Sequence, residues 1–404
     1  MSMKRQIVGM LVVAVGVFAV PTSAVGAGSH RWSQSGGGPG NTAAITAPGN
    51  LSPATVTKLV LDYSHAVSDF VTQSPVIAKG VLYAGTLSGR VLAIDSGNGR
   101  TRWSRSLCDR KQPAYNGSEE TSPAVGSGAV FVLGDGGVLS GIHLAAPHDV
   151  FACVPIPGLA SGNGWSPTIA GGVVYAATDS HVVAVNARTG AMIWSRALPA
   201  GGSAASNVVV DAGLAFVASN NFAETKMGHV FAFDAANGHR RWTVARRDFV
   251  ETLAAADARL ITGGGTVQAW AETTGSSVWA SSVQGADAVT ISGNRVVVAG
   301  SEATPSQGAL IALNATTGSR QWRTLVGSEE ESQPSAGGGV TYLVDLDTGS
   351  LFMNRLSDGH LLAVVSHPDD YYAELGTPVV VDGHIYLFTQ SGSANRLDRW
   401  SAAA

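Results

Sequence analysis

The stretch AIDSGNGRTRW, from Ala93 to Trp103, decides the fold because its pattern returns along the chain. A short apolar run ends at an acidic residue, an Asn-Gly turn follows, and a tryptophan lies four residues after the glycine. A period of about 40 to 50 residues is typical of propellers and solenoids. The Gly-x-x-x-Trp signature begins at Gly99, Gly190, Gly238, Gly275 and Gly318.

The residues around this stretch form one complete structural unit. Four short segments, each rich in apolar or β-branched residues, are separated by turns that contain glycine. We expect four strands, and four strands joined by short turns make one propeller blade. The segments cover residues 74–77, 81–85, 90–95 and 100–107.

The last unit contains only three such segments, at 378–381, 384–389 and 396–402. The segment 58–67 near the N-terminus fits as the missing fourth strand. We therefore predict an all-β fold, an eight-bladed β-propeller of four-stranded antiparallel blades over residues 57–404. Pairing of the N-terminal strand into the last blade would close the ring and leave no open sheet edge.

The repeated aromatic positions have a structural interpretation. Each ring is expected to pack against the next blade and to bury apolar surface there. The polar residue four positions before the glycine, such as Asp95 or Asn186, is expected to hydrogen-bond the adjoining turn. Ala363 replaces the aromatic residue in the seventh unit. The other positions are Tyr63, Trp103, Phe151, Trp194, Trp242, Trp279 and Trp322.

The N-terminus has the pattern of a secretory signal peptide. Lys4 and Arg5 precede an apolar core at residues 7–20, and small residues follow up to Ala27. The core is short for a membrane span, although an uncleaved anchor is the alternative. We predict a signal peptide at 1–27, a lead-in segment at 28–56 and a secreted or extracytoplasmic location.

The net charge argues against a nucleic-acid partner, and the lack of a later long apolar stretch argues against a membrane span. Loss of residues 1–27 would remove two cationic residues and no acidic ones, which changes the formal net charge from -4 to about -6. Nucleic-acid binders instead show clustered Lys and Arg. No later stretch is long and apolar enough for a membrane span. We expect neither partner.

The chain has two cysteines, Cys108 and Cys153. An even pair in an exported protein favours a disulfide, which would stabilise the fold by roughly 4 kcal/mol on the loop-entropy argument. Two unpaired thiols are the alternative interpretation.

The signature resembles the PQQ-like β-propeller repeat, with the form Ala-x-Asp-x-x-x-Gly-x-x-x-Trp in 93–103. The segments 186–194 and 234–242 resemble it too, and WSQSGGGPGNT at 32–42 is similar to the lead-in of secreted members. This superfamily includes quinoprotein dehydrogenases and non-catalytic members such as the outer-membrane assembly factor BamB.

The resemblance implies the non-catalytic branch. In the dehydrogenases an adjacent cysteine pair and a tryptophan sandwich the quinone, and carboxylates hold calcium. This chain has no adjacent cysteines and no Cys-x-x-Cys-His haem motif, and it is shorter than those enzymes. We therefore expect no cofactor, with PQQ and calcium as the disfavoured alternative. The DLDTG stretch at 345–349 resembles the start of a calcium loop, but a turn explains it equally well.

Candidate binding residues lie at the mouth of the predicted funnel. In a blade, the residues before the innermost strand and the turn between the second and third strands lie on one face. Carboxylates beside aromatic rings there could hold a cationic, sugar or peptide ligand, and a solvated polar rim is the alternative. The candidates are Gln73, Glu120, Trp165, Glu251, Asp287, Gln333, Tyr372 and Glu374.

The sequence has no Gly-x-Ser-x-Gly nucleophile motif and no clustered histidines, so neither a serine hydrolase nor a zinc enzyme is indicated. We predict no catalytic residue and no metal site. The expected function is that of an exported, monomeric scaffold or binding protein with a protein or glycan partner at the cell envelope. The alternative is a funnel-site enzyme, either a minimal quinone-dependent dehydrogenase or a lyase.

Overall fold

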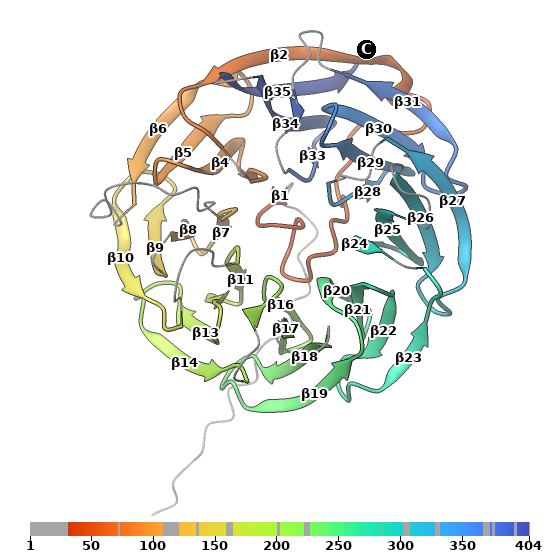
Figure 1. Ribbon diagram of the computed structural model, residues 1–404. Helices are drawn as coiled ribbons and strands as arrows, with labels where there is room; N and C mark the ends of the chain where they lie inside the picture. The colour runs from red at the N-terminus through yellow and green to blue at the C-terminus, as the bar shows by residue number, and fades with distance from the viewer. Residues whose placement is uncertain are drawn as a thin grey trace, which may run out of the picture.

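Antiparallel strands joined by tight turns form almost all of the described regular structure. The computed structural model describes residues 31–71, 73–107, 121–134, 137–158, 165–199, 203–221, 227–283, 285–301, 308–327, 332–366, 372–373, 376–391 and 394–403. Figure 1 shows the sheets arranged as a ring around a central axis, each extending from the axis to the rim. The predicted all-β propeller is confirmed.

Each of the first four blades has four strands that follow one another outward from the axis. Blade 1 contains β3 (Val76–Ala78), β4 (Val81–Thr86), β5 (Arg90–Asp95) and β6 (Thr101–Ser106). Blade 2 contains β7 (Ala124–Gly126), β8 (Ala129–Gly134), β9 (Val138–His143) and β10 (Asp149–Pro155). Blade 3 contains β11 (Thr168–Ala170), β12 (Val173–Ala177), β13 (His181–Asn186) and β14 (Met192–Ala197). Blade 4 contains β16 (Val209–Asp211), β17 (Leu214–Asn221), β18 (Met227–Asp234) and β19 (Arg240–Arg246).

The next three blades repeat this order, and the eighth takes its outer strand from the N-terminal side. Blade 5 contains β20 (Val250–Ala256), β21 (Arg259–Gly264), β22 (Gln268–Ala271) and β23 (Ser277–Ala280). Blade 6 contains β24 (Ala286–Ser292), β25 (Arg295–Ser301), β26 (Gly308–Asn314) and β27 (Arg320–Val326). Blade 7 contains β28 (Ser335–Gly337), β29 (Val340–Asp345), β30 (Ser350–Arg355) and β31 (Leu361–Val365). Blade 8 contains β33 (Val379–Val381), β34 (His384–Ser391), β35 (Ala394–Ala402) and β2 (Leu59–Val67).

Shorter elements add to these sheets. β1 (Arg31–Trp32) pairs with β3 at the axis, whereas β15 (Ser203–Ala204) and β32 (Tyr372–Ala373) extend the sheets of blades 4 and 8. The 3-10 helix η1 (Val56–Lys58) immediately precedes β2.

Blade 8 joins the two ends of the chain. β2 pairs antiparallel with β35 from Leu59 opposite Ala402 to Val67 opposite Asn395. The Tyr63 hydroxyl then donates a 3.0 Å hydrogen bond to the carbonyl oxygen of Ser96 in blade 1. The expected N-terminal strand in the last blade is confirmed.

The apolar core is divided into clusters, most of which lie between neighbouring blades. In one of them Trp194 of blade 3 packs with Phe231 and Phe233 of blade 4. The rings of Trp194, Trp242, Trp279 and Trp322 are each at most 9% exposed. Packing of the repeated aromatic residues against the next blade is therefore confirmed, with Trp103 less completely buried than these four.

The glycine of the signature lies against the repeated aromatic residue of the preceding blade. Gly318 has φ +72°, and a Cβ atom there would lie 2.5 Å from Cε3 of Trp279. Only glycine combines this backbone conformation with such a close approach. Within one Gly-x-x-x-Trp motif, the glycine therefore contacts the preceding blade and the tryptophan contacts the next blade.

The polar residue before the turn acts as predicted. Oδ1 of Asp95 accepts hydrogen bonds from the backbone N–H groups of Gly97, at 2.9 Å, and Asn98, at 3.1 Å. Asn186, Asp234 and Asn314 make the same pair of contacts in their own blades.

Residues 31–47 of the lead-in segment lie inside the ring, at its centre (Figure 1). We call residues 31–47 the strap, because they contact the innermost strand of one blade after another in chain order. The strap pairs with Ile77 through Trp32 and ends with the bond from the Asp382 N–H to the Ala47 carbonyl oxygen. Between them it accepts hydrogen bonds from the backbone N–H groups of Val125, Ile169, Val210, Ala255, Ile291 and Ala336.

Several sequence predictions fall on residues outside the described ranges. These are the signal peptide and Cys108, so the disulfide with Cys153, which lies on the outer strand β10, stays a prediction. Among the described residues, no helix has the length and apolar character needed to cross a membrane.

Candidate functional site

The pairing of the inner strands defines one equivalent position at the mouth of each blade. Each inner strand has one residue that pairs with the second-strand residue five positions later in the chain, as Ile77 does with Leu82 and Ala255 with Leu260. We call the residue four positions before that inner-strand residue the rim position. The rim positions are Gln73, Thr121, Trp165, Ser206, Glu251, Asp287, Ser332 and Gly376.

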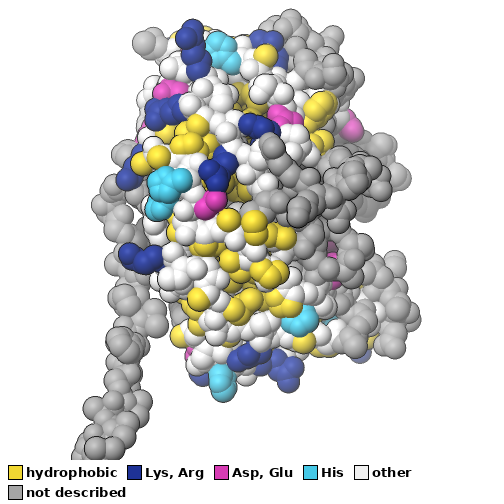
Figure 2. Space-filling view, turned by 90° about the vertical axis from the view of Figure 1, so that its left-hand side faces the viewer, with side chains coloured by type: hydrophobic (Ala, Val, Ile, Leu, Met, Phe, Trp, Pro, Cys, Tyr) yellow, Lys and Arg dark blue, Asp and Glu magenta, His cyan; other side chains and the backbone are white. Residues whose placement is uncertain are grey.

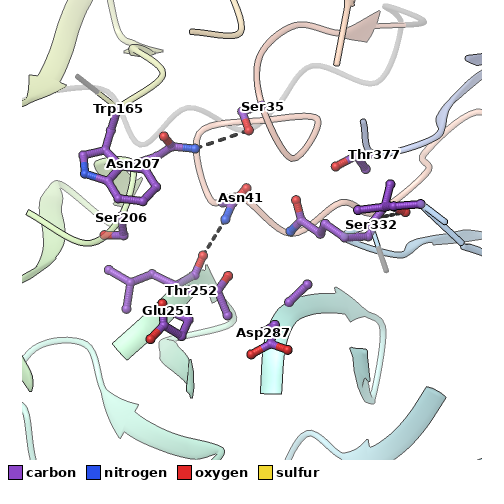
Figure 3. Close-up of a pocket in the computed structure, with 14 residues that line it drawn as sticks. Ser35, Asn41, Trp165, Ser206, Asn207, Glu251, Thr252, Asp287, Ser332 and Thr377 are labelled. Carbon is purple, nitrogen blue, oxygen red and sulfur yellow. Dashed lines mark hydrogen bonds between the residues drawn. The ribbon is translucent and has the colours of Figure 1, made fainter. Parts of the chain in front are cut away.

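A cavity of about 250 Å³ lies at this mouth, and Figure 3 shows its lining. Blades 3 to 8 contribute side chains to it, and the strap contributes two more. The lining comprises Ser35, Asn41, Trp165, Ser206, Asn207, Glu251, Thr252, Leu253, Asp287, Ala288, Ser332, Gln333, Leu346 and Thr377. Leu346 comes from the turn between β29 and β30, so both predicted loop types lie on this face.

The structure brings four of the predicted candidates together in this cavity. They are Trp165, Glu251, Asp287 and Gln333. Gln73 occupies the rim position of blade 1 but does not line the cavity.

Three other candidates are not described at the side-chain level. Glu120 and Glu374 lie outside the described residues, as does the side chain of Tyr372. The strand register also places Thr121, Ser332 and Gly376, rather than Glu120, Gln333 and Glu374, at the rim positions of their blades.

Hydrogen bonds to neighbouring blades hold two of the lining side chains. The indole Nε1–H of Trp165 donates to the carbonyl oxygen of Ala204, at 2.9 Å. Nε2 of Gln333 donates to the carbonyl oxygen of Val289, also at 2.9 Å. Trp165 is 36% exposed, so its anchored ring presents an apolar surface to the cavity.

Glu251 and Asp287 occupy the rim positions of two adjacent blades, and both side chains contact solvent. The surrounding blades displace part of the water near them, and this burial raises the pKa of both carboxyl groups. The negative charge of Asp287 raises the pKa of Glu251 further. The site therefore concentrates negative charge.

The strap forms the part of the lining that the sequence analysis missed. Nδ2 of Asn41 donates a 2.6 Å hydrogen bond to the Leu253 carbonyl oxygen, and Nδ2 of Asn207 donates to Oγ of Ser35 at 3.2 Å. A glycine-rich segment preceding the first strand carries no periodicity, so its path across the axis had no sequence signal. The sequence did contain a signal for Ser332, namely its distance from the following proline. Ser332 lies two residues before Pro334, just as the rim residue Gln73 lies two residues before Pro75.

No hydroxyl among the described lining residues hydrogen-bonds to a carboxylate. No histidine, lysine or arginine is among its residues. Oγ of Ser206 accepts from the Ala218 N–H and Oγ of Ser332 from the Val344 N–H, both at 3.0 Å, so these hydroxyls support the backbone. The described part of the chain also has no group of three or more His, Cys, Asp or Glu side chains placed to hold a metal ion.

Comparison with known sequences agrees with this architecture. The family described as outer membrane protein assembly factor BamB matches residues 60–149, 135–264 and 263–401. The chain belongs to this family. The BamB of Yersinia pestis is 28% identical over 156 residues, which are 36% of this chain and 38% of that protein. The chain thus matches well under half the length of that BamB relative.

Two solved structures show the same fold at low sequence identity. Quinohemoprotein alcohol dehydrogenase from Comamonas testosteroni aligns with a TM-score of 0.72 and 14% identity, over 93% of this chain and 81% of the enzyme. BamB from Moraxella catarrhalis aligns with a TM-score of 0.65 and 16% identity, over 85% of this chain and 99% of that protein. The BamB family therefore shares its propeller architecture with enzymes, and the fold alone does not separate binding from catalysis.

Proposed function

We propose that this BamB-family protein is an exported, monomeric scaffold that binds a partner through the mouth of its funnel without catalysis. The cavity carries the proposal. Its lining combines an anchored tryptophan, two carboxylates and several amides, and the hydroxyls of Ser206 and Ser332 are engaged with the backbone. Such a surface offers recognition groups but no activated nucleophile.

The relatives support a protein partner at the cell envelope. The Yersinia pestis relative is named as an outer membrane protein assembly factor. The N-terminal signal-peptide pattern supports export of this chain. A glycan is the second class of partner that such a polar, partly aromatic mouth would suit.

The competing function is that of a quinone-dependent dehydrogenase, favoured by the structural likeness to the Comamonas testosteroni enzyme. The described residues do not fit that cofactor. PQQ carries three carboxylates, whereas the cavity has two carboxylates of its own and no described lysine, arginine or histidine to oppose the charge. The two cysteines are not adjacent, and Cys153 lies on an outer strand. A lyase that uses the two carboxylates is the other enzyme class.

A titration of the purified protein with PQQ, with and without calcium, tests the choice between scaffold and dehydrogenase. Absorbance and thermal shift would be followed, and alcohols and sugars would then be assayed as substrates. We expect no saturable binding and no turnover. One-to-one binding of PQQ with oxidation of any of these substrates would overturn the proposal.

A further inference from the structure

Glu251 and Asp287 are the two charged groups among the described residues that line the cavity. Neither carboxylate accepts a hydrogen bond or forms an ion pair within the described part of the chain. Figure 3 shows them on two neighbouring inner strands, β20 and β24, and the charge of Asp287 is felt at Glu251. Two adjacent and unneutralised carboxylates in a recess create a field that attracts a cation.

Asp248, which lies three residues before Glu251, differs from it in having an ion-pair partner and a hydrogen-bond donor. Arg246 forms an ion pair with Asp248 at 2.7 Å, and the hydroxyl of Thr266 donates to it at 2.9 Å. The Arg246 guanidinium and this hydroxyl hold the pKa of Asp248 below its usual range, despite its partial burial. The fold thus neutralises a carboxylate three residues away from Glu251, whereas none of the described residues pairs with Glu251 itself.

The remaining lining is suited to an apolar stem. Trp165, Leu253, Ala288 and Leu346 give the cavity an apolar surface beside its carboxylates. An aromatic face also attracts cations, because the ring carries negative charge density on its face. A ligand that pairs a positive charge with a short hydrocarbon chain would use both parts of the lining.

The size of the cavity limits the ligand. Its volume of about 250 Å³ is below the roughly 300–1,000 Å³ of common small-molecule sites. Ser35 and Asn41 of the strap form part of its wall at the centre of the ring. The space therefore suits one extended side chain rather than a folded segment.

Two carboxylates do not make a calcium site. Calcium takes six to eight oxygen ligands, including several carboxylate or carbonyl oxygens. No group of three or more acidic or other metal-binding side chains occurs in the described residues. An ammonium group needs fewer ligands, because it donates three hydrogen bonds.

We propose that the funnel cavity binds an alkylammonium group, presented as a lysine side chain by the protein partner. This inference rests on the proposed function and names the chemistry by which that function recognises its partner. Glu251 and Asp287 would accept the ammonium hydrogens, and the four-carbon chain would lie along the apolar lining toward Trp165.

The test is calorimetric titration of the purified protein with Nα-acetyl-lysine N-methylamide. The neutral analogue Nα-acetyl-norleucine N-methylamide has the same chain without the charge. The double variant Glu251→Gln, Asp287→Asn keeps the shape of the cavity. The matched control is Asp257→Asn, which removes an exposed carboxylate beyond the opposite end of the same strand, β20.

We expect saturable binding of the lysine compound, at least tenfold weaker binding to the double variant, and unchanged binding to the control. The norleucine compound should bind at least tenfold more weakly than the lysine compound. Equal binding of the two compounds, equal binding to the double variant, or preference for calcium or a neutral sugar would each overturn the inference.

The proposed function is judged separately. If a partner contacts the funnel mouth but binds the double variant as tightly as the natural protein, the lysine inference fails and the proposed function stands. If the partner contacts another face, both fail.

Discussion

Trp194 donates its indole Nε1–H to the carbonyl oxygen of Ala235 in the next blade, at 2.9 Å. Trp242, Trp279 and Trp322 make the equivalent bond to Glu272, Ala315 and Leu356. Blades 3 to 6 are thus each joined to the next blade by a buried ring and by one hydrogen bond from that ring. This repeated contact explains why tryptophan is used at the position.

Replacement of Trp194 by phenylalanine keeps an aromatic ring but leaves the Ala235 carbonyl oxygen without its indole donor. We expect Trp194→Phe to lower the free energy of unfolding by about 1–3 kcal/mol, as measured by urea denaturation. Trp103→Phe is the matched control, since no described residue accepts a hydrogen bond from the Trp103 indole. Equal losses in the two variants would contradict the assigned role of the bond.

The glycine of the signature gives a second stability test. Gly318→Ala would combine the strain of a left-handed backbone, about 1–2 kcal/mol, with a clash against the Trp279 ring. Gly293→Ala, in the same blade, has φ +57° but no atom within 4 Å of its added Cβ. We expect Gly318→Ala to be more destabilising by at least about 1 kcal/mol in urea. Equal effects would mean that the ring moves away at no cost.

The strap should protect the inner strands from hydrogen exchange. The N–H groups of Ala255 and Ile291 donate to the carbonyl oxygens of Gly40 and Thr42, on either side of Asn41. Asn41→Ala removes the side-chain bond that fixes this part of the strap. We expect faster exchange at Ala255 and Ile291, with exchange unchanged at Ala269 in the third strand of blade 5. Unchanged exchange at all three sites would show that the strap is held without Asn41.

A buried carboxyl between blades 4 and 5 predicts a pH dependence of stability. Glu272 is 1% exposed. Burial and the negative charges of Asp211 and Asp257 raise the pKa of Glu272 to about 8. In the unfolded chain this pKa returns to about 4.3. As the pH rises between these values, the unfolded state releases its proton while the folded state keeps it, so stability falls.

The side chain of glutamine does not ionise in this pH range. The variant Glu272→Gln therefore has no titrating group at this position in either the folded or the unfolded state. We expect the variant to exceed the natural protein in stability by roughly 2–4 kcal/mol at pH 8 and to approach it near pH 4.5. Urea denaturation at pH 4.5, 6 and 8 measures the difference. A difference that is independent of pH would contradict the raised pKa.

The repeat made the ring predictable, since the signature set the period and the three-strand last unit required the strand that contains Tyr63. Four cavity residues followed from their place before the inner strands. The strap did not follow, because the contacts of Gln34 or Asn41 join residues 135 and 212 positions apart without any local pattern. The missed rim residue Ser332 was an error of one position in the alignment of blade 7.

The most direct measurement is site-specific photo-crosslinking in the cells that produce the protein. A photoreactive residue at Thr377 lies in the cavity lining, and one at Asp257 lies beyond the end of β20 that is opposite to Glu251. We predict that one defined partner crosslinks from position 377 and not from position 257. Crosslinking of that partner from position 257 alone would contradict the assignment of the funnel mouth as the binding site.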